Sequence, residues 1–277
     1  MYFFDSHAHV HLARFGDAQT RRIRLRTAHR AGVRGIVTSA VSPQDWDAAI
    51  TLSRPREGAH RAPSVYSALG LHPYAVSEQQ EANEQHLEAL TQRLAERPAG
   101  VVAVGECGLD FRKKPDGAPH FATAERQLEA FEVQLRLAQA HQLPAVIHCV
   151  RAHGPLYTAL ASLELPPSVL HAFGGSAEQG LALTKLGHYL SFAGNVTLHQ
   201  AKRAREAAAA CPLDRLLIET DSPDQTPASR GAQPNEPAFI VDVARTIAEI
   251  RGCTLAQVVD ASWRNATRVY GVLPQTS

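Results

Sequence analysis

Two histidines near the start of the chain, His7 and His9, are the first residues whose type and spacing indicate chemistry. They follow Phe3 and Phe4, which open a short apolar segment. In an extended strand, side chains two residues apart point to the same side. Two imidazoles on one side of a strand end can therefore bind one metal ion. An isolated His-x-His is more often an ordinary polar turn, so this interpretation depends on further ligands along the chain.

Further residues of ligand type do follow apolar segments. The pairs of segment and ligand are 101–104 with Glu106, 145–147 with His148, 169–170 with His171, and 216–218 with Asp221. Imidazoles with a few carboxylates suit zinc, manganese or related divalent ions better than calcium or magnesium alone. A catalytic zinc commonly takes about three protein ligands, which is fewer than the six found here. Two ions about 3.5–4 Å apart, bridged by one carboxylate, would use all six.

The elements that must position these ligands alternate regularly. Strands are expected from Phe3 and at 34–39, 64–71, 101–104, 145–147, 169–170, 189–192 and 216–218. Helices are expected at 17–31, from Ser42-Pro43, and at 81–96, 177–186 and 201–210. Two more helices are expected, one with Leu128, Phe131, Leu135 and Ala138 on one stripe and one before the strand at 169–170. Eight strands alternating with helices predict a parallel sheet, and at 277 residues they predict a closed (β/α)8 TIM barrel. An open doubly wound sheet would instead place its ligands at one switch-point crevice.

The ligands all come at the carboxyl ends of the expected strands, which is the face where TIM barrels place their active sites. The last segment, 236–272, carries Ile240, Val243, Ile247 and Ile250 at helical spacing. We therefore expect C-terminal helices packed on the exterior of the barrel.

Composition restricts the class of protein further. A length of 277 residues with 44% hydrophobic residues suits one domain spanning residues 1–277. A net charge of +1 excludes a strongly basic nucleic-acid coat protein, so an anionic substrate must be met by local charge. There is no basic-then-apolar leader and no apolar run near ~18 residues. With four cysteines that form no close pair, we expect a soluble cytoplasmic monomer without a membrane partner or a zinc–thiolate site.

Over essentially its whole length, in order, the sequence resembles the TatD family of metal-dependent deoxyribonucleases, within the amidohydrolase superfamily. The motifs that carry the resemblance are His7-Ala8-His9, Gly70-Leu71-His72-Pro73, Gly105-Glu106-Cys107-Gly108-Leu109-Asp110, His148, His171-Ala172-Phe173-Gly174-Gly175-Ser176, Glu219-Thr220-Asp221-Ser222-Pro223 and Asn235-Glu236-Pro237. The resemblance implies a cytoplasmic nuclease that acts on DNA ends or phosphodiesters, although some members have been linked to deacylation.

The resemblance also assigns the ligands. It implies that His7, His9 and Asp221 hold one metal ion, that His148 and His171 hold the other, and that Glu106 bridges the two. The sequence departs from the family pattern at two positions. His11 stands where the family often has Asp, which puts the support of His9 in doubt. Arg151 comes three residues after His148, whereas many members have this arginine two residues after.

Other residues near the ligands have less certain roles. His72 could cap a turn, but its strand-end position and the resemblance favour a hydrogen-bond donor to substrate. Asp5 and Glu219 are two residues from ligands and could orient imidazoles. Asp110 could be only a turn residue. The cationic residues on the same loops, which suit phosphate oxygens, are Arg112, Lys113, Lys114, Arg151, Lys202, Arg203, Arg205 and Arg230.

These residues predict hydrolysis with two divalent ions (zinc, manganese, magnesium or cobalt), with Asp221 as general base and Glu106 as bridge. We favour a deoxyribonuclease that cleaves phosphodiester bonds near single-stranded or frayed DNA ends, with His72, Arg151, Arg112 and Lys113 contacting substrate. The first alternative is a deacylase-type hydrolase of esters, lactones or amides on the same scaffold. The second is a non-catalytic nucleic-acid-binding barrel, which has no need for an intact ligand set.

Overall fold

The structure, a computed structural model, describes residues 1–54 and 61–275. Eight strands form one sheet in the order β1 to β8, and all neighbouring pairs are parallel. The strands are β1 (Phe3–Ala8), β2 (Val33–Ser39), β3 (Ser64–Leu69), β4 (Val101–Asp110), β5 (Ala145–Val150), β6 (Val169–Leu170), β7 (Tyr189–Phe192) and β8 (Leu216–Ile218).

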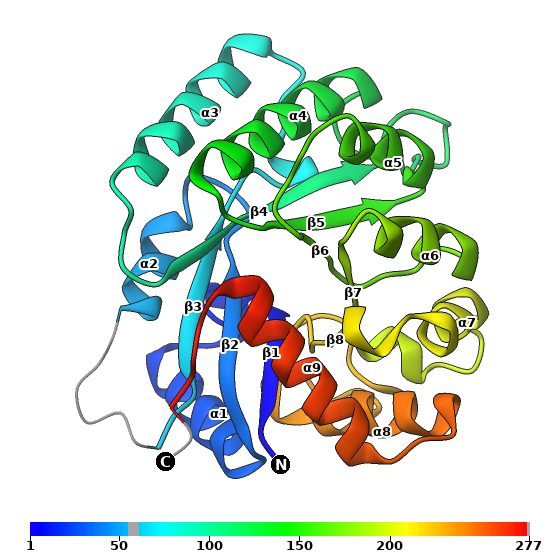
Figure 1. The fold of residues 1–277 in the computed structure, drawn as a ribbon. Helices are drawn as coiled ribbons and strands as arrows, with labels where there is room; N and C mark the ends of the chain where they lie inside the picture. Colours follow the sequence, from blue (N-terminus) through cyan, green and yellow to red (C-terminus); the bar gives the residue numbers. More distant parts are fainter. Residues whose placement is uncertain (55–60, 276–277) are drawn as a thin grey trace.

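Helices follow the strands and lie around the outside of the sheet (Figure 1). They are α1 (Ala18–Arg30), α2 (Trp46–Ser53), α3 (Gln80–Ala95), α4 (Ala124–His141), α5 (His153–Ala161), α6 (Ala177–Lys185), α7 (Lys202–Ala210), α8 (Ile240–Arg251) and α9 (Leu255–Tyr270). One-turn helices occur in the loops as η1 (Ala13–Phe15), η2 (Pro73–Ala75), η3 (Gly194–Thr197), η4 (Leu213–Arg215), η5 (Ala228–Arg230) and η6 (Pro237–Phe239). The predicted (β/α)8 TIM barrel is confirmed.

Two core clusters define the inside and the outside of the barrel. One contains residues of all eight strands, such as Phe4, Val37 and Leu217, together with side chains of α9. The other joins the strands to the surrounding helices, and it includes Phe131 of α4 and Ile247 of α8. The first cluster is therefore the barrel interior, and the second is the layer between the strands and the helices.

Helix α9 completes the barrel at the seam between β8 and β1. The hydroxyl of Tyr270 donates to the carbonyl of Ser6 in β1 at 2.8 Å. Asn265 Nδ2 donates to Leu216 O in β8 at 2.9 Å, and Ile218 N donates to the hydroxyl of Ser262 at 3.1 Å. These contacts satisfy backbone groups at a strand edge, which would otherwise lack partners. The C-terminal helices thus lie on the exterior, as predicted, and α9 also covers the seam.

Several boundaries differ from the sequence prediction: β5 continues from the predicted 145–147 to Val150, and β3 ends at Leu69 instead of Leu71. The predicted helix from Ser42-Pro43 begins only at Trp46, because Asp45 Oδ1 accepts hydrogen bonds from the backbone of Val41 and Ser42 at 3.2 and 3.1 Å and holds a turn there. The strand predicted at 101–104 continues to Asp110, with a register shift between Val104 and Cys107. None of the helices in the described part of the chain is long and apolar enough to span a bilayer.

Candidate metal centre

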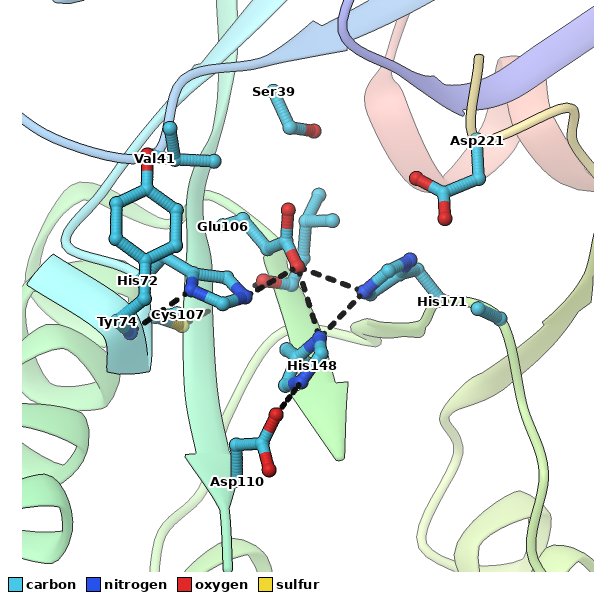
Figure 2. A network of polar contacts seen from close by, with 12 residues as sticks. Ser39, Val41, His72, Tyr74, Glu106, Cys107, Asp110, His148, His171 and Asp221 are labelled. Carbon is cyan, nitrogen blue, oxygen red and sulfur yellow. Dashed lines mark hydrogen bonds and ion pairs between the residues drawn. The ribbon is translucent and has the colours of Figure 1, made fainter. Parts of the chain in front are cut away.

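A cavity of about 840 Å³ opens at the carboxyl ends of the strands. Five of the six predicted ligands line it (His9, Glu106, His148, His171 and Asp221), and His7 lies fully buried beneath them. Glu106 occupies the centre, and Figure 2 shows its carboxylate between His72, His148 and His171. The structure therefore brings together all six residues that were predicted as ligands.

The first group of ligand atoms surrounds one oxygen of Glu106. The Nε2 atoms of His7 and His9 lie 3.2 Å apart, and each lies 3.4 Å from Glu106 Oε2 and 3.4 Å from Asp221 Oδ1. Donors at about 2.1 Å from a zinc ion lie about 3.4 Å from one another in a tetrahedron. Glu106 Oε2 is buried and forms no hydrogen bond within the described residues. The spacing and this unpartnered oxygen fit a divalent ion.

The second group surrounds the other oxygen of the same carboxylate. Glu106 Oε1 lies 2.8 Å from His171 Nε2 and 3.1 Å from His148 Nδ1, and the two nitrogens are 3.2 Å apart. Glu106 thus presents one oxygen to each group. A carboxylate that presents one oxygen to each of two ligand groups is able to bridge two metal ions.

The backbone explains how residues from distant strands reach this point. Asp221 N donates to His7 O at 3.0 Å and His9 N donates to Ser222 O at 2.7 Å, so the end of β8 is fastened to β1. Asp221 has a φ of 55°, a region that Asp adopts more readily than most residues. At Gly108 (φ 137°), a Cβ would clash with the carbonyl of His148, so glycine permits the close approach of β4 and β5.

Hydrogen bonds on the far side of each ring orient the imidazoles. His9 Nδ1 lies 2.8 Å from Ser39 O, so it carries the proton and donates, which leaves Nε2 free for a metal. His7 Nδ1 pairs with the Ser39 hydroxyl at 3.1 Å. His171 is the exception: its Nδ1 lies 3.4 Å from Glu219 Oε1, an ion-pair distance, but forms no hydrogen bond within the described residues.

Two expectations about the surroundings of His7 and His9 need correction. Asp5 does not contact an imidazole: its carboxylate accepts from Thr220 N at 2.8 Å and from the Thr220 hydroxyl at 2.6 Å, and so holds the β8 loop. His11 pairs with the Thr38 hydroxyl at 2.7 Å and lies 3.3 Å from Asp45. Because His9 is oriented by a backbone carbonyl, its support does not depend on the residue at position 11.

The electrostatics of the centre favour cations. Burial alone would raise the pKa of Glu106, but the charge of His171 holds it well below its usual value. Burial would likewise raise the pKa of Asp221, but hydrogen bonds from His7 and His9 hold it well below normal. Burial and the charge of His171 oppose protonation of His7, yet Glu106 and Asp221 raise its pKa to about 9. Both carboxylates are therefore ionised and attract positive charge.

His72 lies beside the second group but differs from the ligands. Its Nε2 is 3.3 Å from Glu106 Oε1, close enough to be counted as a possible ligand together with His148. However, its Nδ1 accepts a hydrogen bond from Tyr74 N at 3.1 Å, and burial lowers its pKa to about 4. The neutral ring therefore carries its proton on Nε2 and directs it at Glu106 Oε1, at the floor of the cavity.

The predicted cationic contacts separate into two sets. Arg112, Arg151 and Arg203 line the cavity, and the guanidinium of Arg112 is held by Asp110 at 2.6–2.9 Å. The residues that do not line it are Lys113, Lys114, Lys202, Arg205 and Arg230. Arg205 instead donates to Val196 O at 3.0 Å, and Arg230 pairs with Asp242 at 2.7 Å.

Sequence reasoning missed several residues at the site. Asp110 contacts His148 at 3.2 Å, and Gln225 Nε2 donates to Asp221 Oδ2 at 2.7 Å. Arg14, Tyr74 and Phe121 line the cavity as well. The signal for Asp110 was its position in the strand that carries Glu106, four residues further on. Tyr74 directly follows the predicted Gly70–Pro73 motif. No comparable signal marks Gln225 or Phe121.

The barrel and the two ligand groups at its mouth define the class of the protein, a metal-dependent hydrolase. The family model described as "TatD related DNase" matches residues 4–271. The chain belongs to this family.

Similar proteins agree with this assignment. The chain is 33% identical over 272 residues to "Uncharacterized metal-dependent hydrolase YjjV" of Escherichia coli (strain K12), covering 98% of each chain. It is 34% identical over 252 residues to "3'-5' ssDNA/RNA exonuclease TatD" of Escherichia fergusonii, covering 88% of this chain and 90% of that protein. The crystal structure of YjjV from Escherichia coli superposes with a TM-score of 0.86 at 32% identity, over 98% of both chains.

Proposed function

We propose that the protein is a two-metal phosphodiesterase that removes nucleotides from the ends of single-stranded DNA. The observation that carries this proposal is Glu106, whose two oxygens each contact one of two histidine groups. The relative from Escherichia fergusonii is named a 3'-5' ssDNA/RNA exonuclease, which supports a single-stranded nucleic acid as the substrate class. The arginines that line the cavity support an anionic substrate.

The ligands divide between two ions as the resemblance implies. His7, His9 and Asp221 would hold one ion, His148 and His171 the other, and Glu106 both. Zinc, manganese, magnesium and cobalt are the candidates, and the four imidazoles favour the transition metals over magnesium alone. When bound, the ions supply a water of lowered pKa and neutralise charge on the phosphoryl oxygens.

Asp221 is the residue that accepts the proton of the attacking water. Its Oδ1 faces His7 and His9, and its Oδ2 accepts a hydrogen bond from Gln225. Because hydrogen bonds from His7 and His9 hold its pKa well below the usual value, the carboxylate is ionised, the state that a proton acceptor requires. His72, which carries its proton on Nε2, donates to a phosphoryl oxygen of the bound substrate.

Charge at the cavity separates this proposal from a hydrolase of neutral esters or amides. Arg151 and Arg203 line the cavity and form no hydrogen bond or ion pair with any residue of the described ranges. Such guanidinium groups suit the charged oxygens of a phosphate better than the uncharged carbonyl of an ester. Arg112 and Lys113 stay predictions as substrate contacts, because Asp110 holds Arg112 and Lys113 is not part of the cavity lining.

The proposal extends to the state of the protein in the cell. One chain supplies the whole ligand set, which supports a monomer that acts as a single domain of residues 1–277. The four cysteines are unpaired, which supports a reducing compartment such as the cytoplasm.

The test combines metal content with turnover. Protein purified without chelator is analysed for bound metal and assayed on end-labelled single-stranded DNA, before and after stripping with a chelator. We expect up to two ions per chain, loss of hydrolysis on stripping, and recovery with manganese, magnesium, cobalt or zinc. Glu106→Gln removes the charge of the proposed bridging carboxylate at nearly constant side-chain volume. Hydrolysis by this variant should not recover when metal is added to the stripped protein. Full activity in metal-stripped protein would disprove the proposal.

A further inference from the structure

The two sides of the cavity have different chemistry. Tyr74 and Phe121 line it on the side of β3 and β4, and their ring centroids lie 6.4 Å apart. Arg151 and Arg203 line it from the loops after β5 and β7. Among the exposed large hydrophobic residues of the described chain, Tyr74 is the one that lines this cavity, and it is 48% exposed. This open ring lies beside a polar centre and is available to a flat ligand.

The aromatic side is continuous with the metal ligands. The ring of His72 lies 4.8 Å from that of Tyr74 and 6.4 Å from that of Phe121, and its Nε2 reaches Glu106 at 3.3 Å. Tyr74 is fixed through its backbone N–H, which donates to His72 Nδ1 (Figure 2). The guanidinium of Arg112 covers Phe121 at 5.4 Å and is itself held by Asp110. These contacts hold the backbone of Tyr74 beside His72 and place Arg112 on one face of Phe121, which leaves the other face for a ligand.

The arginines of the cavity differ in whether their guanidinium groups are already paired. Arg14 pairs with Asp224 at 2.5 Å, and Arg112 pairs with Asp110 at 2.6 Å. Arg151 and Arg203 have neither an ion pair nor a hydrogen bond among the described residues, so their donors remain available to a ligand. An aromatic surface facing free guanidinium groups matches a single nucleic-acid strand, which carries flat bases and charged phosphates.

We propose that Tyr74 and Phe121 form a base-stacking subsite for the terminal nucleotide of a single strand, while Arg151 and Arg203 hold its adjacent phosphate. This subsite rests on the proposed nuclease function and adds the feature that selects the substrate. Because every base has a π-face, stacking accepts all four bases. It also favours single strands and frayed ends over intact duplex, since a base that is stacked in a duplex cannot turn onto these rings.

The test compares two oligonucleotides that differ only at the degraded end, where one carries a base and the other an abasic sugar. The metal-loaded wild-type protein should prefer the base-terminated strand in kcat/KM by roughly 5- to 150-fold, the range expected for one base–aromatic stack. Tyr74→Leu and Phe121→Leu should each reduce this ratio toward one. Tyr74→Phe and Phe121→Tyr, which keep the ring, should retain it. Tyr157→Leu, at an exposed tyrosine of α5 outside this cavity, is the matched control.

The outcomes separate the subsite from the function. A wild-type ratio near one, or equal losses on both strands in the leucine variants, would overturn the subsite and leave the nuclease function standing. If the metal-loaded wild-type protein hydrolyses neither strand, the proposed function is wrong, and the subsite fails with it.

Discussion

His148 Nε2 lies 3.2 Å from Asp110 Oδ2, on the side of the ring that faces away from Glu106. A carboxylate only accepts, so Nε2 carries a proton toward Asp110, and Nδ1, 3.1 Å from Glu106 Oε1, is the ring atom that would bind a metal ion there. Arg112 donates to both oxygens of Asp110 and prevents this carboxylate from turning. Asp110 therefore fixes both the tautomer and the rotation of a proposed ligand.

Replacing Asp110 by Ala should weaken the metal site that contains His148. The loss of such an orienting partner typically costs about 10- to 100-fold in metal affinity. Chelator-competition titration measures this affinity, and Asp110→Asn, which keeps an acceptor oxygen, should recover part of it. Unchanged affinity and stoichiometry in folded Asp110→Ala protein would contradict the positioning role.

Asp221→Asn should reduce turnover by roughly 10²–10⁴-fold while the protein stays folded, because the change removes a base and not core packing. Circular dichroism and bound-metal analysis control for folding and loading. Gln225→Leu should produce a smaller loss, since it removes only the donor to Asp221 Oδ2. Near-normal turnover of folded, metal-loaded Asp221→Asn would show that another group accepts the proton.

The sequence predicted the six-residue ligand set because each ligand follows an apolar segment, and a parallel barrel gathers all strand ends at one face. The role of Asp110 was not predictable in this way. It depends on the register shift between Val104 and Cys107 and on the pairing of Gly108 with His148, both of which involve another strand. The direction in which loop side chains point could not be predicted from the sequence either. Lys202 and Arg203 are adjacent in sequence, yet of these two only Arg203 lines the cavity.

His188 makes the stability of the fold sensitive to pH. It is buried, its Nδ1 accepts a hydrogen bond from Ser168 N at 3.1 Å, and burial lowers its pKa from 6.5 to about 4. As the pH falls, His188 is therefore protonated at a higher pH in the unfolded chain than in the folded protein. Its stabilising contribution is complete above about pH 6.5 and is lost as the pH falls toward about 4.

Urea unfolding at pH 7.5 and at pH 5 tests this linkage. When the pH is lowered from 7.5 to 5, the free energy of unfolding should decrease by about 2 kcal/mol more in the wild type than in His188→Asn. The Asn side chain keeps an acceptor for Ser168 N without titrating. His120→Asn, at an exposed histidine, should lose as much stability as the wild type. Equal losses in wild type and His188→Asn would refute the assignment.

The salt dependence of DNA binding tests the phosphate contacts. Each phosphate that a single strand brings to a cationic group releases counterions, with a slope of about −0.7 in log affinity against log salt. Arg151→Ala and Arg203→Ala should each flatten the slope by about that amount and weaken binding. Arg136→Ala, at an exposed arginine paired with Glu132 on α4, should leave the slope unchanged. Hydrolysis of a small neutral ester should be nearly insensitive both to salt and to the loss of Arg151. A DNA affinity that does not vary with salt would refute the phosphate-binding interpretation and favour an uncharged substrate.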